Sequence, residues 1–228
     1  SADLTEIQAL SMDAILKGKN SLLLSETGSG KTLCYVVPII NQIYKRLAQP
    51  ENKNPMRGAL ILAPTKELCS QIYATFRKLD QEHIIRITRT GSIMHIAPVV
   101  HLLDQRIDPD QLREISQQNM VNALTWSEWD VVVSTPVKLD NLFSMKDKKD
   151  PYDVNPKTVV LDEYDLLLGE ENIAKATTNI LRRFAGVHKS HFGETNKERQ
   201  FILCGATSPR KVGGINIQDE VKNWFVDL

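Results

Sequence analysis

Five short apolar runs, separated by segments with helical periodicity, are the feature that most constrains how this chain can fold. They occupy residues 21–25, 59–64, 130–136, 158–165 and 200–207. Their hydrophobicity is continuous rather than alternating, which is typical of strands buried on both faces of a parallel sheet. Helical patterns lie between them, over 32–47, 66–79 and 173–184. The sequence therefore predicts an α/β fold: an open, mostly parallel sheet with helices on both faces.

Length and composition narrow the class of protein further. At 228 residues we expect one domain over 1–228, with insertions near 93–129 and 188–199. Equal numbers of basic and acidic residues, 28 each, mean that any attraction for a polyanion must be local. Three widely spaced cysteines (Cys34, Cys69 and Cys204) favour free thiols in a reducing compartment. No apolar run reaches the roughly 18 residues of a membrane-spanning helix, so we expect no membrane partner.

Residues 25–32 read SETGSGKT and lie between the first predicted strand and the helical pattern that follows. In such a loop, Gly28 and Gly30 let backbone amides curl around phosphate oxygens, and the helix amino terminus adds a positive dipole. Lys31 would reach the β and γ phosphates, and Thr32 would offer its hydroxyl to Mg²⁺. The general pattern has glycine where Ser25 stands, and the alternative interpretation is a glycine-rich turn that caps a helix.

The run VVLDEYD at 159–165 ends on carboxylates. Asp162 can hold hydrated Mg²⁺, and Glu163 can orient or deprotonate the water that attacks a phosphoryl group. Alone, such a cluster is more often a solvated strand end. Together with the phosphate loop it predicts a site for ATP and Mg²⁺, with Lys31, Asp162 and Glu163 as the catalytic residues.

The order of these motifs resembles the amino-terminal RecA-like domain of the DEAD-box RNA helicases, from Leu4 to about Pro209. SETGSGKT looks like that family's AxTGSGKT, and DEYD takes the place of the DEAD box. The segment LTEIQ at 4–8 is similar to the adenine-reading PTxIQ, with Leu4 in place of proline. The resemblance implies that Gln8 contacts the adenine edge. It also implies that the rest of the ATP contacts come from Thr27, Gly28, Ser29, Gly30, Lys31 and Thr32.

Two further motifs resemble the RNA-binding segments of the family. PTKEL at 64–68 looks like PTREL, and TPVK at 135–138 looks like TPGR. In both, lysine replaces arginine, which keeps the charge but loses a bidentate fork. Gly91 would stand for a glycine pair. The resemblance thus implies RNA binding by Pro64, Thr65, Lys66, Gly91, Thr135, Pro136 and Lys138.

The triplet GAT at 205–207 takes the place of the family's SAT motif. The resemblance implies that Asp165 is tied to the hydroxyls of this motif and to a second domain, so that Asp165, Gly205, Ala206 and Thr207 couple hydrolysis to strand separation. Gly205 lacks one of those hydroxyls, a departure that bears on coupling more than on nucleotide binding. Tyr164 stands where the family usually has alanine, and we expect its side chain to point away from the nucleotide and to serve packing.

We therefore expect the ATP-binding half of an ATP-dependent RNA helicase core, with the second RecA-like domain absent from this chain. The alternative is a helicase-like domain with little activity that acts as an RNA or ribosome-assembly scaffold. A DNA-directed relative is a third interpretation, against which PTKEL and LTEIQ argue. Residues 26–35, together with GAT, resemble mitochondrial members linked to assembly of the large ribosomal subunit. We therefore expect an intracellular protein with a ribosomal or other ribonucleoprotein particle as a partner. The resemblance favours the mitochondrion over the two alternative compartments, the nucleus or nucleolus and the cytoplasm.

Overall fold

A computed structural model describes residues 3–47, 58–84, 100–102, 130–144, 156–184 and 199–207. Gly91 and nearly all of the two predicted insertions lie outside these ranges. The three cysteines lie inside them, and each is a buried free thiol, as predicted. No helix in this part of the chain combines the length and apolarity that a membrane crossing requires.

Within the described residues, six strands form one sheet in the order β1-β6-β5-β2-β4-β3, and every neighbouring pair is parallel. The strands are β1 Ser21–Leu24, β2 Ala59–Leu62, β3 Val100–Leu102, β4 Val131–Ser134, β5 Thr158–Asp162 and β6 Gln200–Gly205. This confirms the predicted parallel α/β sheet. The edge strand β3 lies inside the predicted insertion at 93–129 and was not predicted, because three residues give too short an apolar pattern to recognise.

The described helices are α1 Glu6–Leu16, α2 Lys31–Leu47, α3 Lys66–Ile84, α6 Pro136–Ser144, α7 Tyr164–Gly169 and α8 Glu171–Phe184. The three helical patterns found in the sequence correspond to α2, α3 and α8, each slightly longer than predicted. Each of the five predicted runs extends one to three residues beyond its strand. The difference at the carboxyl end is largest for the run 158–165, which is a strand only as far as Asp162. Glu163 adopts a left-handed backbone conformation, and α7 begins at Tyr164.

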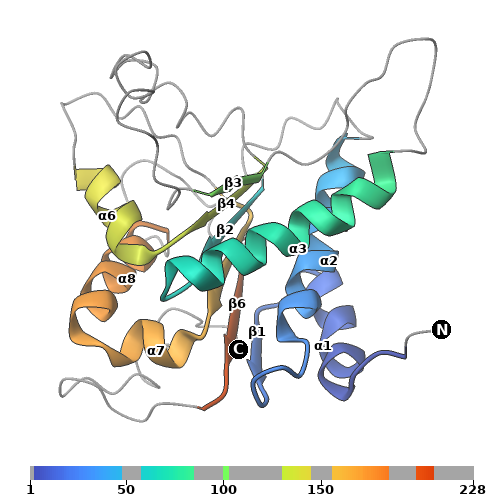
Figure 1. Cartoon of the computed structure of the whole chain (residues 1–228), viewed down its shortest axis with the longest axis horizontal. Coiled ribbons are helices and arrows are strands. Elements are labelled where there is room, and N and C mark those ends of the chain that lie inside the picture. The colour runs from blue at the N-terminus through green and yellow to red at the C-terminus, as the bar shows by residue number, and fades with distance from the viewer. Residues whose placement is uncertain are drawn as a thin grey trace.

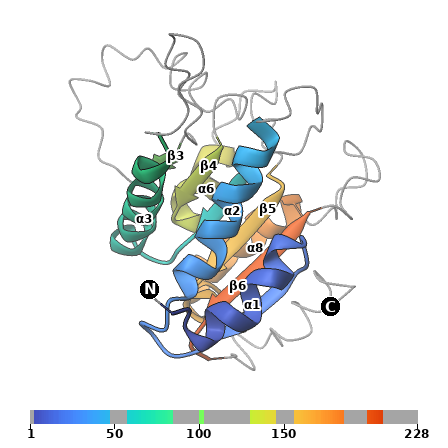
Figure 2. The same ribbon diagram turned by 90° about the vertical axis from the view of Figure 1, so that its right-hand side faces the viewer.

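The helices cover both faces of the sheet in three layers. Figures 1 and 2 show α1, α2 and α3 on one face and α6, α7 and α8 on the other. Successive residues of β5 alternate between the two cores: Val160 packs toward α2, whereas Val159 and Leu161 pack toward α7 and α8. Because both faces are buried, the strand is apolar throughout, which is why its pattern does not alternate.

Gly58 joins the amino ends of three neighbouring strands. Its carbonyl oxygen accepts hydrogen bonds from the amides of Lys157 (3.1 Å) and Thr158 (3.2 Å). Its φ is +71°, and a Cβ at this position would lie 2.2 Å from the backbone oxygen of Asp130. Glycine is thus required here for two reasons, the backbone conformation and the close approach of another strand.

We expect Gly58→Ala to reduce the free energy of unfolding by about 2–4 kcal/mol, from left-handed strain and overpacking together. Gly18→Ala is the matched control, because Gly18 has φ +77° with nothing within 4 Å of the added Cβ. The control should lose only the conformational part, about 1 kcal/mol. Urea unfolding measures both losses, and equal losses would show that the approach of Asp130 does not matter.

Candidate active site

Three motifs meet because their strands are neighbours. β6 lies between β1 and β5, with Leu24 opposite Gly205 and Asp162 opposite Cys204. Parallel strands end at the same edge of a sheet, so the loop after β1, the turn after β5 and the GAT triplet after β6 converge there. The amide of Ser25 donates a hydrogen bond to the oxygen of Gly205 (3.2 Å). The phosphate loop is thereby joined directly to the GAT triplet.

The loop after β1 has the curled backbone that phosphate binding needs. Gly28 and Gly30 have φ values of +81° and +94°. The Lys31 ammonium folds back and donates to the backbone oxygens of Ser25 (2.5 Å) and Glu26 (2.7 Å). The hydroxyls of Ser25 and Ser29 share a hydrogen bond of 2.5 Å across the loop. Ser25, which departs from the general glycine pattern, therefore braces the loop.

Helix α1 supports this loop from outside. Thr5 donates its hydroxyl hydrogen to the oxygen of Ser29 (2.9 Å), and the Gln8 amide nitrogen donates to the oxygen of Gly30 (3.3 Å). The Gln8 side-chain oxygen accepts from the amide of Thr5 (3.1 Å). A Cβ at position 30 would lie 2.4 Å from the Gln8 nitrogen. The structure thus places Gln8 against the phosphate loop, while its contact with adenine stays a prediction.

Asp162 is a buried carboxylate, 4% exposed. One of its oxygens accepts from the Tyr35 hydroxyl (2.8 Å) and the other from the amide of Glu163 (3.1 Å). Burial raises the pKa of Asp162, and these two hydrogen bonds together with the nearby charge of Lys31 offset part of the rise. The side chain of Thr32 lies close enough to the Tyr35 hydroxyl to offset part of the rise in its pKa. Thr32, Tyr35 and Asp162 therefore form one cluster.

Sequence reasoning did not identify Tyr35, although a signal for it exists. It lies four residues after Lys31 on α2 and so on the same face of that helix, the face that packs on the sheet. Its side chain is fully buried, and burial raises the pKa of its hydroxyl well above the usual value. Tyr35 therefore acts as a neutral hydrogen-bond donor to Asp162.

Glu163 has φ 54° and ψ 49°, the only described non-glycine residue with a positive φ. Such a conformation costs a non-glycine residue roughly 1–2 kcal/mol. It is held in place by the start of α7, where the amides of Leu166 and Leu167 donate to the Glu163 oxygen (2.9 and 3.0 Å). Burial, followed by the charges of Asp162 and Asp165, raises the pKa of the Glu163 carboxyl. Backbone strain of this kind concentrates at functional sites.

Asp165 joins the acidic turn to the GAT triplet. Its Oδ2 accepts hydrogen bonds from the amide (3.2 Å) and the hydroxyl (3.0 Å) of Thr207. Gly205 is buried, whereas Ala206 and Thr207 are exposed at the edge of the sheet. The predicted coupling residues thus come together in space.

The predicted RNA-binding motifs follow two other neighbouring strands, β2 and β4. Thr65 caps α3, with its hydroxyl oxygen accepting from the amide of Leu68 (3.2 Å), and Pro136 is the first residue of α6. Lys66 and Lys138 are both exposed. Two exposed lysines at two helix amino termini therefore lie at the same edge of the sheet as the phosphate loop. Pro64 and Thr135 are the turn residues between strand and helix.

The oxygen donors at this edge fit Mg²⁺. The Asp162 carboxylate and the Thr32 hydroxyl are hard oxygen groups that meet around Tyr35. Mg²⁺ usually takes only one or two carboxylates and completes its shell with water and nucleotide phosphate. No group of three or more His, Cys, Asp and Glu side chains suited to a metal occurs in the described part of the chain. The protein would thus supply few of the ion's ligands.

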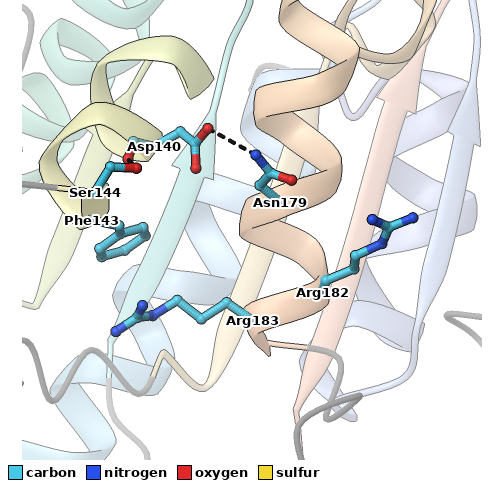
Figure 3. A pocket seen from close by; sticks show the side chains of 6 residues that line it. All are labelled: Asp140, Phe143, Ser144, Asn179, Arg182 and Arg183. Carbon is cyan, nitrogen blue, oxygen red and sulfur yellow. Dashed lines mark hydrogen bonds between the residues drawn. The ribbon is translucent and has the colours of Figure 1, made fainter.

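A separate hollow of about 400 Å³ lies between α6 and α8 (Figure 3). Asn179 donates a hydrogen bond to Asp140 across it (3.0 Å), and the Arg183 guanidinium lies 4.5 Å from the centre of the Phe143 ring. Its lining includes no residue of the phosphate loop, the acidic turn or the GAT triplet. It is therefore not the nucleotide site.

The parallel α/β sheet, together with the phosphate loop and acidic turn at the carboxyl ends of its strands, defines a RecA-like P-loop domain. The family profile described as DEAD/DEAH box helicase matches residues 5–214, and the chain belongs to this family. It is 31% identical over 211 residues to the ATP-dependent RNA helicase DBP4 of Mycosarcoma maydis. The matched residues make up 92% of this chain and 19% of that protein. It is 30% identical over 209 residues to the ATP-dependent RNA helicase DBP3 of Candida glabrata. Here the matched residues make up 91% of this chain and 31% of that protein. The chain thus spans about a fifth to a third of these relatives.

Solved structures show the same fold. A hypothetical ATP-dependent RNA helicase from Sulfolobus tokodaii superposes with a TM-score of 0.64 at 23% identity, covering 100% of this chain and 52% of that one. The DEAD-box helicase Mss116 bound to ssRNA and UDP-BeF superposes with a TM-score of 0.61 at 19% identity, covering 98% and 38%. These structures confirm the predicted fold, while the family profile and the relatives confirm the resemblance inferred from the motifs.

The buried Asp162 carboxylate yields a prediction for stability. The pKa of Asp162 is raised in the folded state. At a pH below the ordinary carboxyl pKa this side chain is protonated in both the folded and the unfolded protein, so its burial as a charged group does not reduce stability there. The folded state loses stability as the pH rises through the raised value. Asp162→Asn removes this penalty. We expect it to increase the free energy of unfolding at about pH 8 by on the order of 1 kcal/mol.

Urea unfolding in EDTA at a series of pH values measures this gain, which should shrink toward zero as the solution is acidified. Asp13→Asn is the control, because Asp13 is exposed and paired only with the exposed Lys17. A stability loss in the Asp162 variant at about pH 8, or a gain that does not change with pH, would contradict the prediction.

Proposed function

We propose that this chain is the ATP-binding half of an ATP-dependent RNA helicase core. The observation that carries the proposal is the meeting of the phosphate loop, the acidic turn and the GAT triplet at the ends of β1, β5 and β6. Membership of the DEAD/DEAH box helicase family supports it. So do relatives named ATP-dependent RNA helicases, of which this chain matches one segment.

Nucleotide binding begins at the phosphate loop. Backbone amides of residues 27–32 and the amino terminus of α2 would surround the phosphates. Lys31 would exchange its present acceptors, the oxygens of Ser25 and Glu26, for negatively charged phosphate oxygens, which make stronger hydrogen bonds to an ammonium group. Before ATP binds, Thr5 and Gln8 already hold the loop in its curled shape. The loop backbone therefore loses little conformational freedom on binding.

In ATP hydrolysis, the neighbouring carboxylates Asp162 and Glu163 would have different roles. Bound Mg²⁺ neutralises phosphate charge, and Asp162 and Thr32 are the residues that would hold it. Glu163 would orient the attacking water and accept its proton. The raised pKa of Glu163 brings this carboxylate closer to the working pH, which favours general-base catalysis. Tyr35 keeps the Asp162 carboxylate in one orientation through their 2.8 Å hydrogen bond.

RNA would bind along the same edge, at the ends of β2 and β4. Lys66 and Lys138 are exposed there, in the first turns of α3 and α6, where the positive end of each helix dipole favours phosphate. Contacts of this kind position the RNA backbone without reading sequence, and they weaken as salt rises. We therefore propose RNA binding with little sequence preference.

A second RecA-like domain would complete the enzyme. The hydrogen bonds between Asp165 and Thr207 lie at the exposed edge, where such a domain could sense whether ATP is bound. Closure of the two domains on RNA would bend the bound strand, and hydrolysis would release it. Alone, this chain is expected to bind ATP weakly and to hydrolyse it slowly.

The scaffold hypothesis is the second candidate function. It is motivated by four departures from the family pattern: Leu4, Tyr164, Gly205 and Val137, which stands where the family's TPGR has glycine. Process and compartment stay predictions from the sequence: assembly of the large ribosomal subunit, in mitochondria, with a ribonucleoprotein particle as partner. The residues that support them are 26–35 and the GAT triplet.

The test that separates enzyme from scaffold is Glu163→Gln in the full-length protein. We expect RNA-stimulated ATP hydrolysis to fall by about 10²–10⁴-fold, because a general base is lost. Affinity for ATP should change little, since Glu163 does not belong to the phosphate loop. ATPase rates and ATP titrations measure the two effects. Glu170→Gln, the same substitution at the exposed end of α7, should alter neither.

If RNA-dependent function in cells survives the loss of hydrolysis, the scaffold hypothesis is favoured. Rapid RNA-stimulated hydrolysis by residues 1–228 alone would instead contradict the half-core proposal.

A further inference from the structure

Tyr164 and Gly205 are the two positions at which the acidic turn and the GAT triplet depart from the family pattern, and in the structure they touch. A Cβ built on Gly205 would lie 2.7 Å from Cε1 and 2.8 Å from Cδ1 of the Tyr164 ring. Gly205 does not have a positive φ. Glycine is therefore required at 205 by the tyrosine ring and not by the backbone conformation.

Neither partner is free to move away. The Tyr164 side chain is 2% exposed and packs in the core with Leu161, Leu167 and Leu203. Gly205 ends β6, pairs with Leu24 of β1 and accepts the hydrogen bond from Ser25. A side chain at 205 would thus meet a ring fixed by the core on one side and a backbone fixed by the sheet on the other.

The contact reaches the functional carboxylates. The same added Cβ would lie 3.0 Å from Oδ1 of Asp165, whose Oδ2 accepts from Thr207. Tyr164 is the first residue of α7 and directly follows Glu163, which has the strained left-handed backbone. Displacing the ring would therefore shift the residues on both sides of it.

We propose that Tyr164 and Gly205 form one positioning unit, in which the tyrosine ring occupies the space of a side chain at 205. Packing of the ring on the bare backbone of Gly205 fixes the acidic turn relative to Thr207 and the phosphate loop. Asp165 then reaches the GAT triplet through Thr207. The two departures compensate each other, so Gly205 is not an isolated loss of a hydroxyl. The catalytic consequence rests on the proposed ATPase function, whereas the packing does not.

The experiment compares Gly205→Ser in two backgrounds, the natural protein and Tyr164→Ala, using the full-length protein. In the natural background, we expect the kcat of RNA-stimulated ATP hydrolysis to fall at least about tenfold, because a small displacement of a catalytic group has a large effect on rate. KM for ATP should stay within about threefold, since the phosphate loop is intact. In the Tyr164→Ala background, the same substitution should change kcat less than about threefold.

Thermal unfolding of the same four proteins provides a readout that does not need activity. Gly205→Ser should lower the midpoint by several degrees only where the tyrosine is present. Gly169→Ser at the end of α7 is the matched control, because nothing lies within 4 Å of its added Cβ. Its effect should be small and equal in both backgrounds.

Each outcome decides a different part of the proposal. Equal effects of Gly205→Ser in both backgrounds overturn the pairing. Coupled midpoints with uncoupled kcat values overturn the positioning role and leave only packing. If no protein hydrolyses ATP, including the natural one, the proposed function fails while the midpoints still test the pair. If Gly205→Ser alone does not fold, folding of the double variant supports the proposal and its failure overturns it.

Discussion

The parallel pairing of β6 between β1 and β5 is the constraint on which the rest of the site depends. It places Leu24, Gly205 and Asp162 at the same edge of the sheet. The residues that follow each strand therefore lie close together. The hydrogen bond from Ser25 to Gly205 extends this pairing by one residue into the phosphate loop. Loop, acidic turn and GAT triplet are therefore held by backbone geometry before any side chain contributes.

Around that edge the protein keeps several unfavourable features. A carboxylate is buried at Asp162, a non-glycine residue is left-handed at Glu163, and the pKa of each carboxyl is raised. Two cores packed on opposite faces of the sheet support them. Tyr35 reaches Asp162 from the first core and Tyr164 reaches Gly205 from the second. The two tyrosines thus support the site from opposite faces of the sheet.

The sequence predicts what is local or buried on both sides. Continuous apolar runs identify five strands, and four of them, β2, β4, β5 and β6, are buried along their whole length. The first, β1, lies at the edge of the sheet and exposes Leu22 and Leu24, so the expectation that it is buried on both faces was wrong. The loop and acidic motifs identify the edge of the sheet that carries the site. Contacts between distant segments leave no such pattern. The roles of Tyr35 and Gln8 inside the protein, the left-handed turn at Glu163 that ends β5 early, and the fit of Tyr164 to Gly205 all depend on packing between elements. The short strand β3 was missed because three residues carry too little pattern.

A crystal structure of this domain with a non-hydrolysable ATP analogue and Mg²⁺ would show whether the edge formed by β1, β5 and β6 is the nucleotide site. We expect the Lys31 ammonium to leave the oxygens of Ser25 and Glu26 and to lie within hydrogen-bond distance of a phosphate oxygen. Asp162 should keep its hydrogen bond from Tyr35. An analogue bound elsewhere, for example in the hollow between α6 and α8, or bound phosphates with Lys31 still on its own loop, would contradict this assignment of the nucleotide site.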